Sequence, residues 1–551
     1  MLAYHERSKH APGRYAASLG YLDWATQPDP WRRFAGAPRS ALPLGEPDPE
    51  LSLDALGGPH VARPLDASTL STLLGLSLGL TAWKAHGGSR WALRANPSSG
   101  NLHPTEGYLL LPSVDGLSST PAIFHYLSRE HALEERAVLS EELWRELAAG
   151  LPEASFFVAL TSIHWREAWK YGERAYRYCQ LDAGHALAAV AYAAGCVGWH
   201  TRLAPHVDDD GLARLLGVDR AKDFPVAPER EVPELLLAIS PEPPESAWCA
   251  APWPDARTRE AVEHALWRGR AETLSPDHEP WDVIDEVSRA THKGEAASAT
   301  AAALASTGHA GLVAPPPSAL PDTGAPVSAA HLIRSRRSAQ AYDGEATLSA
   351  ASFFALLDRL LPRADRPPHE AWPYPPAHDL VFFVHRVDEL APGLYLLART
   401  PDGAARLRQA LRPDFEWSRP DEAPAHLPFY RLAPGVVTEF ARFASCTQEI
   451  ASDGVFAMSY LARFRPSLEG HGAWFYRALY WEAGALGQVC YLEAEARGLR
   501  ATGIGCFFDD VVHRLLGLEG EDHQVLYHLA VGRALEDRRL TTLPPYPAPP
   551  G

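Results

Sequence analysis

The sequence predicts an α+β protein in which one fold is duplicated in tandem and the two copies form an intrachain pseudo-dimer. The main observation is a repeat, because residues 172–218 align with residues 472–518 at a constant offset of 300 without a gap. In addition, apolar strand-like runs and helical patterns precede an Ala- and Pro-rich segment and start again after it. Two copies of one fold normally pack around an approximate two-fold axis.

The repeat is carried by glycines, charged residues and one leucine pair. The identical positions include Gly172 and Gly472, Tyr176-Arg177 and Tyr476-Arg477, Ala183-Gly184 and Ala483-Gly484, Gly198 and Gly498, Asp209-Asp210 and Asp509-Asp510, and the Arg-Leu-Leu-Gly runs that end at Gly217 and Gly517. A series of matches at one offset is the signature of a duplicated unit.

The chain is therefore predicted to have four segments. They are an irregular N-terminal extension (1–60), a first copy (61–275), an Ala/Pro-rich linker (276–330) and a second copy (331–551). We expect the linker to be partly extended, because its composition is rich in Ala, Pro, Gly and Ser and poor in aromatic residues.

Composition limits the classes of partner. The chain has 551 residues, 46% of them hydrophobic, and a formal net charge of −17, which argues against a general surface for nucleic acids or anionic membranes. The start of the chain is polar and charged, and no apolar run reaches the ~18 residues that span a bilayer. The six cysteines show no C-x-x-C spacing. We expect a cytoplasmic protein with no nucleic-acid, membrane or metal partner.

The elements of the first copy are predicted in the following order. A helix is predicted from Asp66 to Trp83, because Asp66 or Ser68 could cap its N-terminus and leucines recur along it. A turn cluster over 96–101 leads into a buried strand at Tyr108–Leu111. The continuous apolar run over 154–163 predicts a strand covered on both faces. The Ala-rich amphipathic pattern over 165–197 predicts a long helix.

Short polar motifs divide between the two copies. The first copy contains the loop Pro97-Ser98-Ser99-Gly100-Asn101, and the equivalent Pro-rich region of the second copy has no Ser or Asn. The second copy contains Arg336-Arg337-Ser338 and Gly503-Ile504-Gly505. At the offset of 300 the first copy has Leu203-Ala204-Pro205 instead, and proline has no N–H to donate. Each copy therefore lacks the motifs that the other has kept.

In their order, spacing and division, these motifs resemble those of the FMN-dependent nitroreductase superfamily. The resemblance is strongest to the SagB-type group, which includes azoline (thiazoline or oxazoline) dehydrogenases. It covers most of the chain and implies two intertwined α+β units with FMN at their interface. One unit of such a pair supplies an Arg-x-Ser-x-basic motif, a Gly-rich segment near flavin N5 and basic residues near its C-terminus. The other supplies a Pro-Ser-Ser-x-Asn loop.

Carried onto this chain, the resemblance implies one intact composite FMN site and one degenerate site. An Arg and a Ser would contact the phosphate and the ribityl chain, and the Gly-Ile-Gly backbone would offer N–H groups to flavin N5 and O4. The loop of the first copy would reach the same flavin across the pseudo-two-fold axis. The implied cofactor-binding residues are Arg336, Ser338, Gly503, Ile504, Gly505, Pro97, Ser98, Ser99 and Asn101.

One position departs from the superfamily pattern. The basic residue expected shortly after Ser338 is Gln340, which removes one charge from the phosphate site. Arg533, Arg538 and Arg539 are expected to supply this charge. Arginine suits a phosphate because a charge-assisted hydrogen bond is roughly twice as strong as a neutral one.

The pair Lys170-Tyr171 occurs once, because the aligned residues of the second copy are Gly470 and His471. It matches a Lys-Tyr pair implicated in catalysis in azoline dehydrogenases. Oxidation of an azoline requires removal of a proton from one carbon and of a hydride from its neighbour. A lysine whose pKa is lowered by desolvation, or a tyrosine, could be the base. Lys170 is favoured as the base and Tyr171 as its positioning partner, and the opposite assignment stays open.

Three functions agree with these patterns. The first is FMN-dependent oxidation of a heterocyclic or amino-acid-derived substrate, either a small molecule or part of a peptide. The second is an NAD(P)H-dependent nitroreductase or flavin reductase, since the superfamily needs no dinucleotide fingerprint. The third is a non-catalytic scaffold without flavin, for which Gln340 is the main support. The electron acceptor and any further oligomerisation of the pseudo-dimer stay open.

Overall fold

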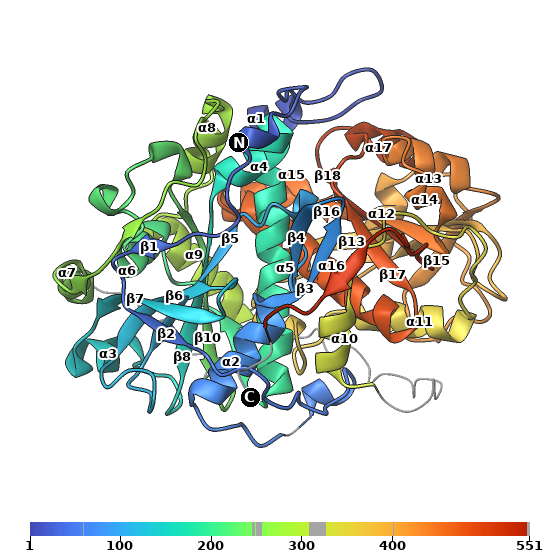
Figure 1. Cartoon of the computed structure of the whole chain (residues 1–551). Helices are drawn as coiled ribbons and strands as arrows, with labels where there is room; N and C mark the ends of the chain where they lie inside the picture. The colour runs from blue at the N-terminus through green and yellow to red at the C-terminus, as the bar shows by residue number, and fades with distance from the viewer. Residues whose placement is uncertain (59, 245–247, 249–255, 308–326, 401, 548–551) are drawn as a thin grey trace.

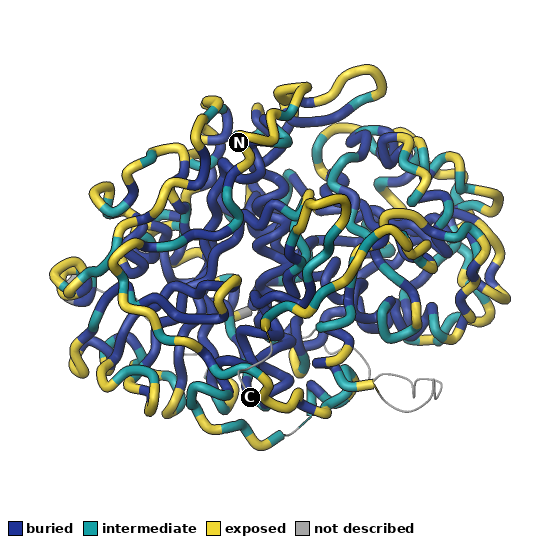
Figure 2. The backbone as a smooth tube through the Cα atoms, viewed as in Figure 1, coloured by how far each residue is buried: buried dark blue, intermediate teal, exposed yellow. Residues whose placement is uncertain are grey.

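The computed structural model describes residues 1–58, 60–244, 248, 256–307, 327–400 and 402–547. Two mixed helix-and-sheet halves lie side by side, and two long helices run between them (Figure 1). These central helices are α5 (Ala175–Cys196) and α16 (Phe475–Ala496). Every residue of α5 is buried, and buried backbone fills the centre of the molecule (Figure 2).

The first half contains an antiparallel sheet in the strand order β11-β7-β6-β5-β8-β10-β9, with β2 also paired with β7. Its strands are β2 (Arg39–Ala41), β5 (Thr105–Leu111), β6 (Ala122–Leu127), β7 (Ala132–Val138), β8 (Phe156–Ser162), β9 (His200–Leu203), β10 (Val232–Ser240) and β11 (Leu266–Trp267). Both β5 and β8 are buried at every residue, as their continuous apolar sequences predict.

The second half contains a six-stranded sheet in the order β15-β14-β13-β16-β18-β17. Its strands are β13 (His378–Val384), β14 (Gly393–Leu397), β15 (Phe429–Pro434), β16 (Phe456–Arg463), β17 (Arg500–Ile504) and β18 (His523–Gly532). A third sheet joins β19 (Thr541–Leu543), near the C-terminus, to β3 (Leu80–His86) and β4 (Ser89–Arg94) of the first half. The two halves are therefore intertwined.

The remaining elements surround these sheets. The helices are α1 (Leu2–Arg7), α2 (Ala67–Ser77), α3 (Glu141–Leu147), α4 (His164–Tyr171), α6 (Asp209–Leu216), α7 (Ala256–Glu263), α8 (Asp282–Ala290), α9 (Glu295–Thr307), α10 (Ala329–Ser335), α11 (Ala350–Arg359), α12 (Gly403–Ala410), α13 (Thr438–Ala444), α14 (Ile450–Asp453), α15 (Phe464–His471) and α17 (Asp509–Leu516). Two short strands, β1 (Phe34–Ala35) and β12 (Arg270–Ala271), pair with each other. No helix of the described ranges has the length and apolarity that crossing a bilayer requires.

The predicted helix over Asp66–Trp83 is wrong in its second part. Asp66 caps α2 as predicted, since its carboxylate accepts from Thr69 N–H, but the helix ends at Ser77. The next residues form β3, which turns into β4 through Gly87 and Gly88. Both glycines have positive φ values, as a two-residue hairpin turn requires, and this hairpin draws the leucine- and aromatic-containing stretch into a strand.

The predicted helix over 165–197 is interrupted. It consists of α4 and α5, separated at Gly172, whose φ is 54°. A Cβ at this position would overlap the carbonyl oxygen of Ala17. Gly172 therefore permits both the break between the helices and the close approach of the N-terminal segment.

Two helices lie within the segment that the sequence analysis predicts as a partly extended linker. Within 276–330, α8 and α9 are helical rather than extended. The alanine-rich sequence that was interpreted as a linker also has high intrinsic helix propensity, which explains the difference for α9. Residues 308–326 lie outside the described part of the chain.

The two halves meet where α5 crosses α16. A Cβ at Gly184 would overlap the carbonyl oxygen of Trp481, and a Cβ at Gly484 would overlap that of Leu181. The same close approach thus occurs twice, at positions related by the offset of 300. The crossing confirms the tandem duplication as a physical pseudo-two-fold axis.

Two buried ion pairs also join the halves, and each half supplies the arginine of one pair and the aspartate of the other. Arg177 of the first half contacts Asp509 of the second (2.5 Å), and Arg477 of the second contacts Asp209 of the first (2.7 Å). All four side chains are buried. A buried charge is costly without its partner, so each half satisfies the charges of the other.

The N-terminal extension and the linker contact these aspartates in the same way. His10 N–H donates to Asp509 Oδ2 (2.8 Å), and its carbonyl accepts from Asp509 N–H (3.0 Å). Lys293 N–H donates to Asp209 Oδ2 (2.8 Å), and its carbonyl accepts from Asp209 N–H (2.9 Å). The segment that follows α1 and the segment that follows α8 are therefore structural equivalents.

Substituting Gly484→Ala should destabilise the protein. An alanine in a helix interior is worth about 1 kcal/mol more than glycine, but overpacking against rigid backbone costs about 1–3 kcal/mol or more. The expected result is a lower midpoint of thermal or urea unfolding of the full chain. Gly470→Ala is the matched control, because its Cβ would meet no atom within 4 Å and the midpoint should stay or rise. Equal midpoints for the two variants would contradict the role of the crossing.

Candidate active site

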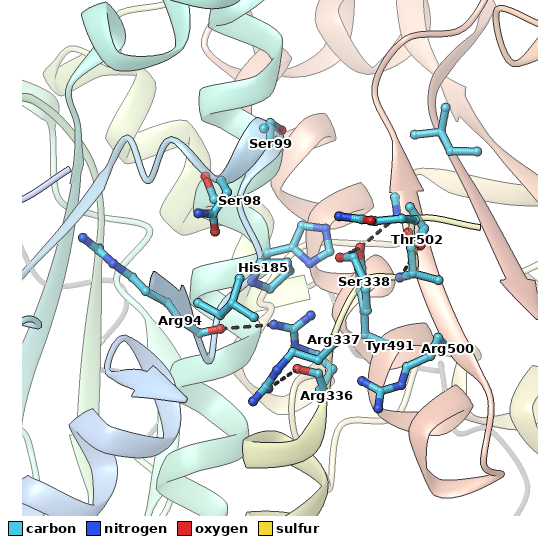
Figure 3. A pocket seen from close by; sticks show the side chains of 18 of the residues that line it. Arg94, Ser98, Ser99, His185, Arg336, Arg337, Ser338, Tyr491, Arg500 and Thr502 are labelled. Atoms are coloured by element: carbon cyan, nitrogen blue, oxygen red, sulfur yellow. Dashed lines mark hydrogen bonds between the residues drawn. The ribbon is translucent and has the colours of Figure 1, made fainter. Parts of the chain in front are cut away.

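A cavity of about 660 Å³ is lined by residues of both halves (Figure 3). Its wall combines the 96–103 loop, residues of α5, the 335–340 segment, the end of β17 and the 534–542 segment. The volume is in the range of cofactor pockets. The residues predicted from sequence that line it are Pro97, Ser98, Ser99, Asn101, Tyr171, Arg336, Ser338, Gly503, Ile504 and Gly505.

Asp182 of α5 holds the loop of the first half in place. Ser99 N–H donates to both carboxylate oxygens (3.0 and 3.1 Å), and the Ser99 hydroxyl donates to Oδ1 (3.0 Å). Burial raises the pKa of Asp182 to about 7, although hydrogen bonds from Ser98 and Ser99 oppose the rise. Asp182 also lines the cavity, so the wall contains a carboxyl group that changes protonation near neutral pH.

The turn at Gly100 and Asn101 brings the loop against Tyr171. Both residues have positive φ values, 59° and 60°, and a Cβ at Gly100 would overlap the Tyr171 hydroxyl. Asn101 Nδ2 donates to the Ala92 carbonyl (3.0 Å). The Asn101 amide thus stabilises the shape of the loop.

Arg336 is a buried cation at the wall of the cavity. Its guanidinium donates to the Arg94 carbonyl (3.1 Å) and lies 5.1 Å from the ring centre of Tyr491. Within the described ranges, no carboxylate pairs with it, and its Nε has no hydrogen-bond partner. Burial lowers the pKa of Arg336. Such a cation favours an anionic ligand.

Arg337 and Arg500 add positive charge on the same side of the cavity (Figure 3). Arg337 donates only to backbone carbonyls, including that of Arg334 (2.7 Å). Burial, followed by repulsion from Arg336 and Arg500, lowers the pKa of Arg337 to about 10. Arg500 lies 3.4 Å from a carboxylate oxygen of Glu495. Three guanidinium groups with one carboxylate partner leave the cluster positively charged.

The Gly-Ile-Gly segment packs tightly against tyrosines. A Cβ at Gly503 would overlap the Tyr527 hydroxyl, and a Cβ at Gly505 would overlap the ring of Tyr178. Gly503 N–H donates to the Tyr491 hydroxyl (2.9 Å), which is also 2.9 Å from Ser338 Oγ. The expectation that Gly503 offers its amide to a ligand is therefore not met in this structure, because Tyr491 already accepts it.

Of the predicted pair Lys170-Tyr171, Tyr171 alone is a described lining residue of the cavity. Tyr171 lines the cavity, whereas Lys170 is not among the described lining residues and its Nζ lies 5.2 Å from the ring centre of Tyr171. Burial and the nearby Glu167 raise the pKa of Tyr171 well above its usual value. Tyr171 is therefore a proton donor rather than a base at neutral pH.

The C-terminal arginines are not among the described residues that line the cavity, although Asp537 and Leu540 beside them are. Arg538 and Arg539 are exposed, and Arg539 pairs with Asp537 (2.8 Å). Arg533 contacts Asp343 (3.5 Å). Among the described lining residues, the charge expected from this segment is supplied instead by Arg337 and Arg500.

The residues of the first half that align with the Gly-Ile-Gly segment, and the aromatic residue that aligns with Arg174, are buried. Leu203 and Ala204, aligned with Gly503 and Ile504, are each 2% exposed. Trp474, aligned with Arg174, is also buried, and its ring lies 5.5 Å from Lys293 Nζ. A leucine thus stands where the other position has Gly503, and a tryptophan where it has Arg174.

Asp182, Arg337 and Arg500 are among the lining residues that the sequence analysis missed. A signal for Asp182 was present, because the repeat aligns it with another acid, Glu482. Glu482 accepts from Ala377 N–H (2.9 Å) in the second half, just as Asp182 accepts from Ser99 N–H. Arg337 lies between Arg336 and Ser338, the two residues of the motif that the resemblance assigns to the flavin. Nothing in the sequence singled out Arg500.

Comparisons with known proteins agree with this architecture. A crystal structure of a candidate nitroreductase from Anabaena variabilis matches 97% of this chain and 99% of its own, with 23% identity and a TM-score of 0.66. A candidate nitroreductase of Methanocaldococcus jannaschii is 25% identical over 175 residues, which cover 30% of this chain and 80% of that protein. The nitroreductase family signature matches residues 63–227 and 333–533, one region in each half. The chain belongs to the nitroreductase family, with its domain present twice.

Proposed function

We propose that the chain is an FMN-dependent oxidoreductase with one composite flavin site, the cavity between the halves. The observation that carries the proposal is the group Arg336, Arg337 and Arg500 at one end of this cavity. Within the described residues, the ion pair of Arg500 with Glu495 is the only one that these three guanidinium groups form. A phosphate group would supply the missing negative charge and accept hydrogen bonds from the guanidinium groups.

The residues present fit FMN in further respects. Arg336 Nε and Asn96 Oδ1 are buried polar atoms without partners at the wall, so a polar ligand would satisfy them. Gly503 and Gly505 also line the cavity, and their lack of side chains lets Tyr527 and Tyr178 pack directly against this part of the wall. When bound, FMN supplies a hydride acceptor. The packed pseudo-symmetric position supports a stoichiometry of one FMN per chain rather than two.

The substrate class proposed is a heterocyclic or amino-acid-derived compound, oxidised in the manner of SagB-type dehydrogenases. Its oxidation needs a group that accepts a proton at the cavity wall. Asp182 is placed for this role, since it lines the cavity and its pKa of about 7 matches a base that works near neutral pH. Tyr171 would orient the substrate through its hydroxyl, and Lys170 would act on Tyr171 or be the alternative base.

Replacing Arg336→Ala should weaken FMN binding about 10- to 100-fold, because charged hydrogen bonds contribute about 1.5–3 kcal/mol each. Flavin content and fluorescence titration of the full chain measure this. Arg539→Ala is the matched control and should bind FMN like the unaltered protein. Two FMN per chain would refute the single composite site, and a protein that takes up no FMN would refute the proposed function.

The proton acceptor can be identified with a thiazoline-containing peptide as the probe. In the FMN-loaded protein, anaerobic bleaching of the flavin should accelerate as pH rises through about 7, because Asp182 must lose its proton to act as a base. Asp182→Asn should slow bleaching about 10²- to 10⁴-fold and remove this pH dependence. If Asp182→Asn keeps the pH profile and Lys170→Ala loses it, the base is Lys170. Bleaching by NAD(P)H alone would favour a flavin reductase.

The protonation of Asp182 should also make the free energy of unfolding depend on pH, and this can be measured without any substrate. A carboxyl whose folded-state pKa lies above its unfolded-state value stabilises the fold only while it is protonated. The free energy of unfolding of the unaltered protein, relative to Asp182→Asn, should therefore fall as pH rises from about 4 to about 7 and then level off. A difference that rises with pH over this window would contradict the assignment.

A further inference from the structure

Two cysteines adjoin the cavity on neighbouring loops of the second half. Cys506 follows Gly505 and lines the cavity, and Cys446 lies just after α13. Phe508 N–H donates to the Ala444 carbonyl (2.8 Å) on one side of this pair. On the other side, Gln448 Nε2 donates to the carbonyl of Cys506 (2.9 Å). The two loops are thus clamped on both sides of the cysteines.

The turn of the first loop brings the two cysteines into one hydrophobic cluster. Cys446 and Thr447 both have positive φ values, 54° and 60°, which are uncommon for residues with side chains and turn the loop sharply. Cys506 packs against the cluster that contains Cys446, and each thiol is the main influence on the pKa of the other. Cys446 is 9% exposed, whereas Cys506 is half-buried.

The surroundings of Cys506 favour its thiolate. The neighbouring Cys446 thiol, and then the imidazole of His10, lower the pKa of Cys506. His10 Nδ1 accepts from Ala16 N–H (2.9 Å), so the proton of its neutral ring is on Nε2 and can be donated to sulfur. Arg174 donates to the carbonyl of Gly505 (3.1 and 3.2 Å), next to Cys506 in sequence. A thiolate is the reactive form in thiol–disulfide chemistry.

The other described cysteines differ in each of these respects. Burial raises the pKa of Cys179, Cys196 and Cys490, and none of the three lines the cavity. The residue aligned with Cys506 in the first half is His206. The thiol therefore occurs only beside the retained Gly-Ile-Gly segment, at the predicted flavin position.

We propose that Cys446 and Cys506 form a reversible dithiol–disulfide pair that exchanges electrons with the flavin. The electron exchange rests on the proposed function, whereas disulfide formation does not. In the oxidative direction the two thiols lose two electrons and two protons, and one S–S bond forms. Oxidised FMN takes up both electrons and both protons and becomes the dihydroflavin. The reverse reaction restores both thiols and oxidised FMN.

Disulfide formation is tested on the flavin-free full chain. Treatment with diamide should lower the count of free thiols by two and yield a disulfide-linked peptide that contains both Cys446 and Cys506 on mass mapping. Subsequent reduction should restore both thiols. Because the unaltered sequence is used, no variant has to fold. Absence of the linked peptide would overturn the pair, whether or not the protein binds FMN.

Electron exchange is tested on the FMN-loaded chain. After oxidation, anaerobic titration with dithionite should consume four electrons per bound FMN, against two for Cys446→Ser and for Cys506→Ser. Cys490→Ser is the matched control and should consume four. A disulfide that forms while the unaltered protein consumes only two electrons would overturn the exchange with flavin. A protein without FMN would instead fail the proposed function and leave the disulfide result standing.

Discussion

The close crossing of α5 and α16 positions the groups on which the cavity depends. Tyr178, Asp182 and His185 project from α5 at helical spacing, and Tyr491 comes from α16. Since the helix backbones meet at Gly184 and Gly484, a side chain at either position would push the helices apart. Because neither Gly184 nor Gly484 has a Cβ, α5 holds Asp182 in the same cavity wall as Tyr491 of α16, whose ring contacts Arg336.

The two ion pairs between the halves favour this one packing of the halves against each other. Arg177 and Asp209 belong to one half, yet each finds its partner in the other. If the halves separated, these side chains would be left without the partners that offset their desolvation. The N-terminal segment and the segment before α9 donate backbone hydrogen bonds to the same aspartates, so they fasten the junction instead of merely preceding or connecting the copies.

The duplication could be predicted because the residues that repeat are the ones that join the halves. Gly184 and Gly484, the arginines at 177 and 477, and the aspartates at 209 and 509 are identical at the offset of 300. The cavity was only partly predictable, since its charges no longer repeat once each half has diverged. Arg500 reaches the wall through the fold of β17, and no local motif marks it. The end of α2 was missed because a Gly-Gly hairpin outweighs the leucine pattern before it.

The pairing of β19 with β3 sets the order in which the protein can be completed during synthesis. Lys84 and Thr542, which hydrogen-bond across these strands, are 458 residues apart in the chain. The hairpin of β3 and β4 leaves the ribosome long before β19 does, so its outer edge stays unpaired until β19 has emerged. An unpaired strand edge is a template for association with other chains. Slow translation of the second half would prolong this exposure, because the partner strand follows 458 residues later in the chain.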